Sequence, residues 1–279
     1  MPCAAPASLP RPRSLAHAKS PTLPRPRSLS CSAAKLLSTL HRASLSERSE
    51  VARQAYAAAA AQVAKGAPTE VLGRVVEELL ERYVSDDGGV EDGIRLAVGG
   101  MARELLRVAT DAMMRVRTDW LPLLFLGKHE PRSQVEQANA PTAAQKEEKG
   151  KLAALWNEVY DEAGVGPSLL TLHLPEIMAL LTRVVNGPSW ALRRAAAYGL
   201  IELESVVPAA SLERHPKEKE QMGRLAAVLT ERKWRDKEGD ALKAIEKMGA
   251  PFALPPGSGD AEDAEEPKAA DPEADSGDF

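Results

Sequence analysis

Apolar residues recur at intervals of three and four along most of the chain between residues 33 and 249, which is the spacing of one helix face. The segment 69–84 is the clearest case, and its helical register holds Leu72, Val75, Val76, Leu79, Leu80 and Val84. Turn signals rich in Gly, Pro, Asp and Ser separate the periodic segments. The pattern predicts helices over residues 33–43, 44–66, 69–84, 90–109, 110–127, 151–164, 168–186, 187–203, 217–232 and 233–249.

Local signals refine the ends of these helices. Ser44 and Glu47 have the spacing of a capping box and predict a helix start at that point. The run Gly66-Ala67-Pro68 predicts the end of the same helix. Pro122 is expected to kink or restart the helix over 110–127, because proline has no backbone N–H to donate.

Composition agrees with a chain made of helices only. Apolar residues make up 44% of the 279 residues, yet aromatic residues make up only 4%. Much of the apolar content is Ala and Leu, which favour helices, and the Val, Ile and Thr runs typical of strands are missing. The sequence therefore predicts an all-α fold.

A repeat organises the predicted helices into pairs. Each second helix of a pair has a basic residue near its start, at Arg53, Arg95, Arg193 and Lys237. The first two lie 42 positions apart and the last two 44, while the middle interval of 98 covers about two periods. A period of about 40–47 residues with two helices per unit is typical of HEAT-type solenoids. We expect about five helix pairs, with an ordinary bundle of four or five helices as the alternative.

The segment 187–203, GPSWALRRAAAYGLIEL, has mostly small residues in its middle. In a stack of hairpins the second helix lies between its own partner and the next pair, so Ala195–Ala197 and Gly199 would permit close approach. Trp190 is expected to be buried over the edge of the hairpin. The basic residue of each second helix is expected to reach toward acidic side chains of a neighbouring pair.

Charge and proline content divide the chain into a body and two tails. We interpret residues 1–32 as a disordered basic leader, 33–251 as the solenoid with a flexible loop at 131–148, and 252–279 as a disordered acidic tail. Residues 1–46 hold seven Lys or Arg and no acid, whereas 257–279 hold nine acids and one Lys. Ser14 and Ser28 each follow an Arg by three positions, the spacing that basophilic kinases accept, although low-complexity filler is the simpler interpretation.

Candidate chemistry is sparse. His129-Glu130 lacks the second histidine of a zinc protease motif, since position 133 is Ser. His173 stands alone on an apolar helix and is expected to be a packed or capping residue. GVGPSL at 164–169 has Pro where a phosphate-binding loop needs an N–H, and the acids of 85–93 lack the final Glu of a calcium loop. We predict no catalytic, metal or cofactor site, no small-molecule substrate and no enzyme activity.

Charge, apolar runs and cysteine positions restrict the kinds of partner and the cellular compartment that we expect. The net charge of −4 and the few aromatic residues argue against a nucleic-acid partner, and no apolar run is long enough to span a membrane. Cys3 and Cys31 both lie in the proline-rich leader, which favours a reducing compartment, cytoplasm or nucleus. The leader has the composition of a transit peptide, but its seven prolines disfavour the helix that such a peptide forms.

Three segments resemble a known family. They are LPLLFLGKHE (121–130), ALWNEVYDEAG (154–164) and PSWALRRAAAYGLIEL (188–203). Their order and spacing are similar to those of the proteasome adapter and scaffold protein family, large HEAT-repeat proteins. The residues that carry the resemblance are Phe125, Leu126, Gly127, His129, Glu130, Trp156, Glu158, Val159, Ser189, Trp190, Trp234, Lys237, Glu238, Leu242, Lys243, Ala244 and Ile245.

The resemblance covers about residues 44–249 and implies a non-catalytic scaffold. By this likeness the chain would bind core and regulatory particle subunits of the proteasome, link or stabilise them in ubiquitin-dependent degradation, and lie in cytoplasm and nucleus. Members of the family are far longer, and this chain corresponds to their last few repeats. The family has no catalytic residues that could be assigned to this chain. The resemblance also does not identify which residues bind partners. The alternative is a HEAT-type scaffold for another assembly, of the transport or phosphatase kind.

Overall fold

The structure is a computed structural model that describes residues 27–85, 92–129, 143–231 and 239–252. Every regular element in these residues is helical. The helices are α1 (Arg27–Ser46), α2 (Glu50–Ala64), α3 (Thr69–Val84), α4 (Asp92–Val108), α5 (Thr110–Met114), α6 (Arg117–Lys128), α7 (Ala143–Glu162), α8 (Pro167–Leu172), α9 (Leu174–Asn186), α10 (Trp190–Val206), α11 (Ala209–Arg214), α12 (Pro216–Glu231) and α13 (Gly239–Gly249), followed by a 3-10 turn at Ala250–Phe252.

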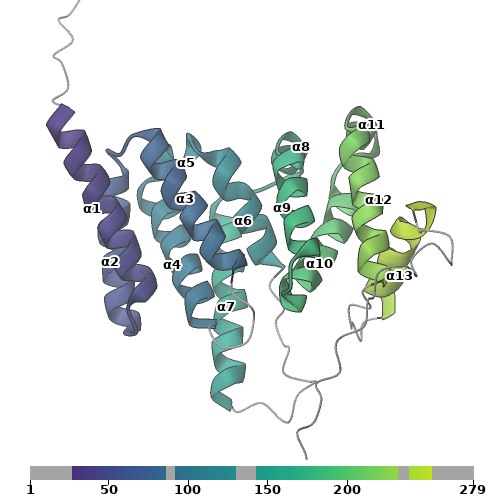
Figure 1. The fold of residues 1–279 in the computed structure, drawn as a ribbon, viewed down its shortest axis with the longest axis horizontal. Helices are drawn as coiled ribbons and strands as arrows, with labels where there is room; N and C mark the ends of the chain where they lie inside the picture. Colours follow the sequence, from purple (N-terminus) through teal and green to yellow (C-terminus); the bar gives the residue numbers. More distant parts are fainter. Residues whose placement is uncertain (1–26, 86–91, 130–142, 232–238, 253–279) are drawn as a thin grey trace, which may run out of the picture.

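The long helices form five pairs within the described residues, which lie side by side along the long axis of the molecule (Figure 1). The pairs are α1/α2, α3/α4, α6/α7, α9/α10 and α12/α13, and the short helices α5, α8 and α11 lead into the last three. This arrangement confirms the predicted all-α, HEAT-like solenoid. None of the described helices is long and apolar enough to cross a membrane.

The pairs stack as two layers. The first helices α1, α3, α6, α9 and α12 each contact the next one, and in the second layer α2 contacts α4 and α4 contacts α7. A continuous set of buried apolar side chains runs from Leu37 on α1 to Ile245 on α13. Each pair thus buries its apolar faces against its neighbours, as a solenoid requires.

Several helices begin or end at residues other than those predicted. The helix expected over 110–127 is interrupted between Met114 and Arg117, and Pro122 lies inside α6. The segment 168–186 divides at His173, because Pro175 lies in the first turn of the new helix α9. Residues 143–148 of the expected loop 131–148 are the first turns of α7, and the rest of that loop lies outside the described residues.

The two predicted tails fall mainly outside the described part of the chain. The basic leader was assigned to residues 1–32, yet α1 begins at Arg27, so Ser28 is in its first turn. Ser14 lies outside the described residues, as does the acidic tail apart from Phe252.

The predicted capping box at Ser44 and Glu47 is wrong. Ser44 belongs to the last turn of α1, and its hydroxyl donates to the carbonyl of Arg53 at 3.2 Å. Ser49 is the N-cap of α2, and its hydroxyl accepts from the N–H of Ala52. Glu47 instead accepts the backbone N–H groups of Arg48 and Ser49, which fixes the short link between α1 and α2.

The small residues of α10 do permit close approach, as expected. A Cβ added at Gly199 would lie 3.0 Å from the ring of Phe125 on α6. Ala195, Ala196 and Ala197 are fully buried, and α10 contacts helices of three pairs, α6, α9, α12 and α13.

The predicted burial of Trp190 is wrong, since its side chain is 45% exposed. Trp190 is the first residue of α10, directly after the N-cap Ser189. The carbonyls of the turn that it was expected to cover, Gly187 and Pro188, accept hydrogen bonds from the guanidinium of Arg193 at 2.6 and 2.8 Å. The cation, not the ring, therefore closes the edge of this hairpin.

Candidate interaction groove

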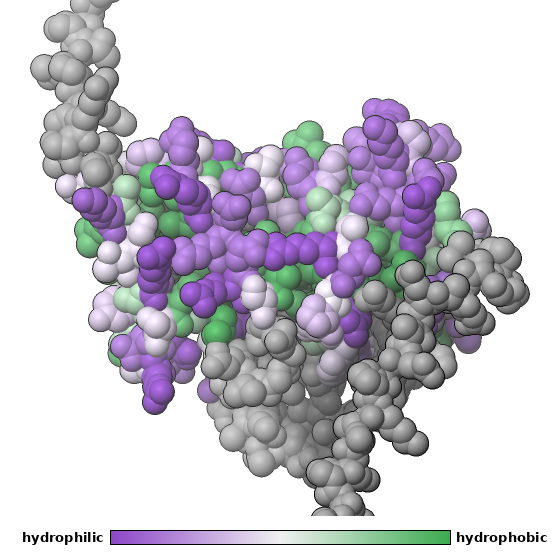
Figure 2. Space-filling model, in the orientation of Figure 1, coloured by the Kyte–Doolittle hydropathy of each residue, from purple (hydrophilic) through white to green (hydrophobic). Residues whose placement is uncertain are grey.

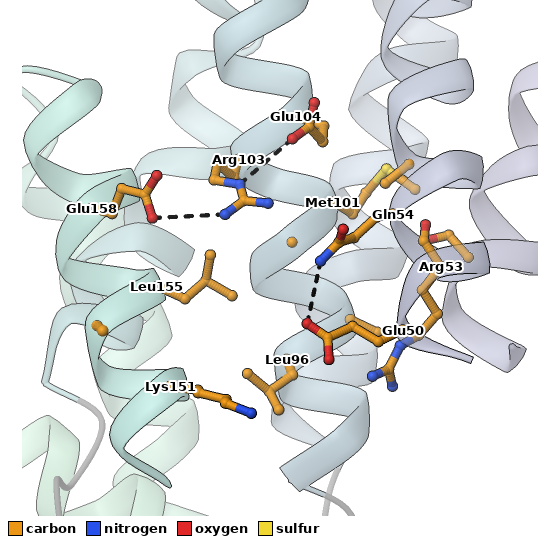
Figure 3. A pocket seen from close by; sticks show the side chains of 15 residues that line it. Glu50, Arg53, Gln54, Leu96, Met101, Arg103, Glu104, Lys151, Leu155 and Glu158 are labelled. Atoms are coloured by element: carbon orange, nitrogen blue, oxygen red, sulfur yellow. Dashed lines mark hydrogen bonds and ion pairs between the residues drawn. The ribbon is translucent and has the colours of Figure 1, made fainter. Parts of the chain in front are cut away.

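A groove of about 470 Å³ crosses the second-helix layer between α2, α4 and α7. Figure 3 shows side chains from all three helices around it. Its lining residues are Ser44, Glu50, Arg53, Gln54, Ala57, Leu96, Ala97, Gly100, Met101, Arg103, Glu104, Lys151, Ala154, Leu155 and Glu158. The groove thus spans three consecutive pairs of the solenoid.

The floor of the groove is apolar and combines small residues with Leu96, Met101 and Leu155. Ala97 and Met101 are buried in α4, whereas Leu96 and Leu155 are partly exposed. A Cβ added at Gly100 would meet no atom within 4 Å, so this glycine faces open space. The missing side chain at Gly100 leaves room for an apolar group of another molecule to approach the α4 backbone.

Arg53 forms the wall on the α2 side. Its guanidinium donates to the carbonyl of Gly93 on α4 at 3.3 Å, so this cation reaches the neighbouring pair as predicted. The acceptor is a backbone carbonyl and not the predicted acidic side chain. Beside it, Gln54 donates to Glu50 at 3.3 Å within the same helix.

Arg103 forms the wall between α4 and α7. Its guanidinium lies 3.5 Å from the carboxylate of Glu104 and 3.7 Å from that of Glu158 on α7 (Figure 3). Glu104 also accepts a hydrogen bond from Arg107 at 2.9 Å. The walls therefore carry both signs of charge close together, with an apolar floor between them.

A stack of large side chains holds α4 and α7 in place beneath the groove. The guanidinium of Arg95, which is only 2% exposed, lies 5.5 Å from the ring centre of Tyr83. Tyr83 meets the ring of Trp156 edge to face at 5.4 Å. Arg95, the second of the repeated cations, thus contacts an aromatic ring of its own pair, a contact that its sequence position did not reveal.

Several of the residues that carry the family resemblance, among them Phe125, Gly127, His129 and Trp156, meet at the junction of α6, α7 and α10. A Cβ added at Gly127 would lie 2.5 Å from the ring of Trp156, so the indole lies against the α6 backbone. Phe125 contacts His129 edge to face at 5.1 Å. The two motifs around Gly127 and Trp156 are therefore two sides of one packing contact. Glu130, Trp234, Lys237 and Glu238 lie outside the described residues.

Glu202 of α10 pairs with two basic side chains at this junction. Lys128 donates to its two carboxylate oxygens at 2.7 and 2.9 Å, and His129 lies 3.0 Å away. Burial raises the pKa of Glu202, but the hydrogen bonds and charges of His129 and Lys128 outweigh burial and lower that pKa to about 2. The Lys128 ammonium also lies 4.3 Å from the ring centre of Tyr160, whose pKa is raised by burial and by Glu202. His129 is thus a structural partner of Glu202.

The described residues contain no cluster of three or more His, Cys, Asp and Glu able to hold a metal ion. His173 is 8% exposed, between α8 and α9, with its ring 3.9 Å from Glu176, so it is a packed residue as expected. Sequence reasoning left the partner-binding residues open and did not find the groove. The available signal was the pair Gly99-Gly100 within α4, because one of two adjacent glycines in a helix must face away from the packing contact.

Two comparisons with known proteins bear on the family. Residues 22–84 match the HEAT-repeat domain of the proteasome adapter and scaffold protein ECM29. A segment of 170 residues, 61% of this chain, is 24% identical to "Proteasome component ecm29" of Schizosaccharomyces pombe. These matches confirm the resemblance to Ecm29-like HEAT-repeat scaffolds over part of the chain.

The matched segment spans only 9% of the length of the fission yeast protein. No solved structure matches the chain.

Proposed function

We propose that this chain is a non-catalytic scaffold that binds proteasome subunits through the groove between α2, α4 and α7. The observation that carries the proposal is that a groove spanning three repeats lies on a chain whose first helices match the ECM29 HEAT-repeat domain. Scaffold repeats bind partners on the extended surfaces that their stacked helices create. The groove and the partial family match together support this proposal.

The chemistry of the groove suits a protein segment. An apolar floor with charged walls resembles the centre and rim of protein interfaces, where apolar groups are buried and ion pairs surround them. Leu96 and Leu155 offer contacts to an apolar anchor, and Arg103 and Glu158 offer polar contacts at its edge.

The finer role that we propose is an adapter between core and regulatory particles of the proteasome, acting in ubiquitin-dependent degradation in cytoplasm and nucleus. The names of the matched proteins support the proteasome as partner.

The test compares two glycine substitutions in the tagged full chain. Gly100→Arg fills the groove, and Gly66→Arg places the same side chain at a position that is outside the groove and equally free of neighbours within 4 Å. Each protein is expressed in cells and purified under mild conditions, and the associated proteins are quantified by mass spectrometry. Circular dichroism melts check that both variants fold like the parent.

We expect core and regulatory subunits to be enriched with the parent and with Gly66→Arg, and reduced at least tenfold with Gly100→Arg. Equal recovery with both variants would place the contact outside the groove. Absence of proteasome subunits from all three samples would overturn the proposal and favour a scaffold of another assembly.

A further inference from the structure

One side of α10 presents a row of large side chains. Trp190 is the largest of the six apolar side chains that are exposed in the described part of the chain, at 45%. Arg194, Tyr198 and Ile201 follow it at intervals of four, four and three residues, so all four lie on one side of the helix. Tyr198 and Ile201 are partly exposed there. We call these four residues the α10 face.

Two cations make the first half of α10 positively charged. The guanidinium of Arg194 lies 5.7 Å from the ring centre of Tyr198, and Arg193 is its neighbour in the chain. The first turn contains no acid, and the two acids of the helix, Glu202 and Glu204, lie in its second half. Trp, Tyr and Arg are the residues that contribute most to binding at protein interfaces. The α10 face therefore has the composition of a contact surface for an acidic segment.

The 98-residue interval between Arg95 and Arg193 relates this face to the groove. It aligns three residues of the α10 face with three that line the groove, namely Arg194 with Leu96, Tyr198 with Gly100 and Ile201 with Arg103. The same side of the second helix therefore faces outward in both pairs. Where α4 leaves open space at Gly100, α10 carries the ring of Tyr198. The α10 face thus offers rings to pack against and no hollow to fill, which suits an extended segment.

We propose that the acidic segment 260–266 of this chain docks on the α10 face. The segment holds five acids, Asp260, Glu262, Asp263, Glu265 and Glu266, and Pro267 follows it. Its carboxylates complement the charges of Arg193 and Arg194, and proline-containing segments pack against aromatic side chains.

Other pairings within the chain match less well in charge. The three cations that line the groove are balanced by three acids, so the groove has no net attraction for an acidic segment. The basic leader has the same sign of charge as Arg193 and Arg194 and is repelled by them. The α10 face and the acidic segment are therefore the complementary pair.

The acidic segment is long enough to reach the α10 face. The last described residue is Phe252, whose ring lies against Gly223 of α12. Both α12 and α13 contact α10 (Figure 1). The eight residues from Phe252 to Asp260 span up to about 27 Å, and α10, with 17 residues, is about 25 Å long. Docking therefore needs no movement of the helices.

Docking makes the acidic segment a reversible cover of the α10 face. Ion pairs between exposed side chains are weak and are screened by salt, so a partner with a stronger contact to Trp190 displaces the segment. The proposal does not involve the groove or the proteasome, and its failure leaves the proposed function unaffected.

The test measures whether the acidic segment lies close to Trp190 in the full chain. A nitroxide spin label is attached at Ala264→Cys, with Cys3→Ser and Cys31→Ser so that one thiol remains. Fluorotryptophan replaces tryptophan, and the fluorine NMR resonance of Trp190 is assigned with Trp190→Phe. We expect the oxidised label to lower the intensity of this resonance at least twofold relative to the reduced label.

Two charge variants of the same length separate docking from chance encounters. Asn or Gln in place of the five acids of 260–266 should restore the Trp190 intensity, because the attraction to the α10 face is removed. The matched control makes the same exchange at the four acids of 271–278 and should retain the loss. Circular dichroism melts check that all variants fold like the parent.

An unchanged Trp190 resonance, or a loss that the five substitutions leave intact, would overturn the proposal. Spin-labelled chains without fluorine are also mixed with fluorinated chains without a label. No loss in this mixture supports docking within one chain. An equal loss would assign the segment to a second copy and overturn it.

Discussion

The junction of α6, α7 and α10 and the helix α2 both have small residues along a helix face. At the junction a neighbouring ring covers these residues, whereas on α2 several of them are exposed. At the junction of α6, α7 and α10, Gly127 lies under the ring of Trp156 and Gly199 under the ring of Phe125. On α2, Ala55 and Ala59 are exposed. Small residues along a helix therefore indicate a surface suited to close approach, and only the structure tells whether a neighbour occupies it.

The junction also differs from α2 in its polar contacts. Lys128 and Glu202 join α6 to α10 across 74 positions, and Arg183 and Glu81 join α9 to α3 across 102 at 2.5 Å. Hydrophilic side chains form a band across this side of the molecule in Figure 2. The middle of the solenoid is thus linked by charges as well as by packing.

The largest effect is expected from Trp156→Ala. The indole is fully buried and contacts Tyr83, Gly99 and Gly127, so its loss leaves a large cavity among α3, α4, α6 and α7. We expect a loss of about 3–5 kcal/mol in the free energy of unfolding. Urea denaturation followed by circular dichroism measures it. A loss below about 1 kcal/mol would contradict the central role of this ring.

A smaller effect is expected from Gly127→Ala, about 1–3 kcal/mol of destabilisation. The new methyl group would lie 2.5 Å from the Trp156 ring, which must shift. The matched control is Gly100→Ala, where the methyl group meets nothing within 4 Å. Because alanine favours a helix over glycine, this control should stabilise the chain by about 0.5–1 kcal/mol. Equal signs for the two variants would contradict the contrast between the covered and the open glycine.

Replacing Glu202 tests the charged side of the junction. Its pKa of about 2 lies below the ordinary value of 4.5, so the unfolded chain binds the proton first as pH falls. The stability contributed by the carboxylate is complete above pH 4.5 and is lost as pH drops from there toward 2. Glu202→Gln should cost about 1.5–3 kcal/mol at neutral pH, since it removes a charged acceptor of Lys128. Its unfolding free energy should also fall less steeply below pH 4.5, in denaturant titrations at each pH.

Much of the fold could be predicted because helix periodicity and repeat spacing are local properties of the sequence. The register of Arg53 and Arg95 predicted both the pairing and the reach of Arg53 toward the next pair. Helix boundaries were less predictable: Ser44 and Ser49 both suit an N-cap, and only the packing of α1 against α2 decides between them.

The site was harder to predict, since a groove depends on which residues of three separate helices face one another. Gly99 and Gly100 are adjacent and identical in sequence, yet one contacts Leu155 and the other faces open space. The family motifs around Gly127 and Trp156 indicated a scaffold, and their contact became apparent only when α6 and α7 were placed together. The same limit explains why the burial of Trp190 was predicted wrongly.

The smallest effect is expected from Trp190→Ala, which compares this exposed tryptophan with the buried Trp156. Trp190 is 45% exposed at the first position of α10, and Arg193 already satisfies the carbonyls of the adjoining turn. Removing the ring therefore leaves little cavity, and we expect less than about 1 kcal/mol of destabilisation in the same urea titration. Arg193→Met, which removes the hydrogen bonds to Gly187 and Pro188, is the companion variant and should cost more. A loss of about 3 kcal/mol for Trp190→Ala would show that the ring, and not the guanidinium, holds this hairpin closed.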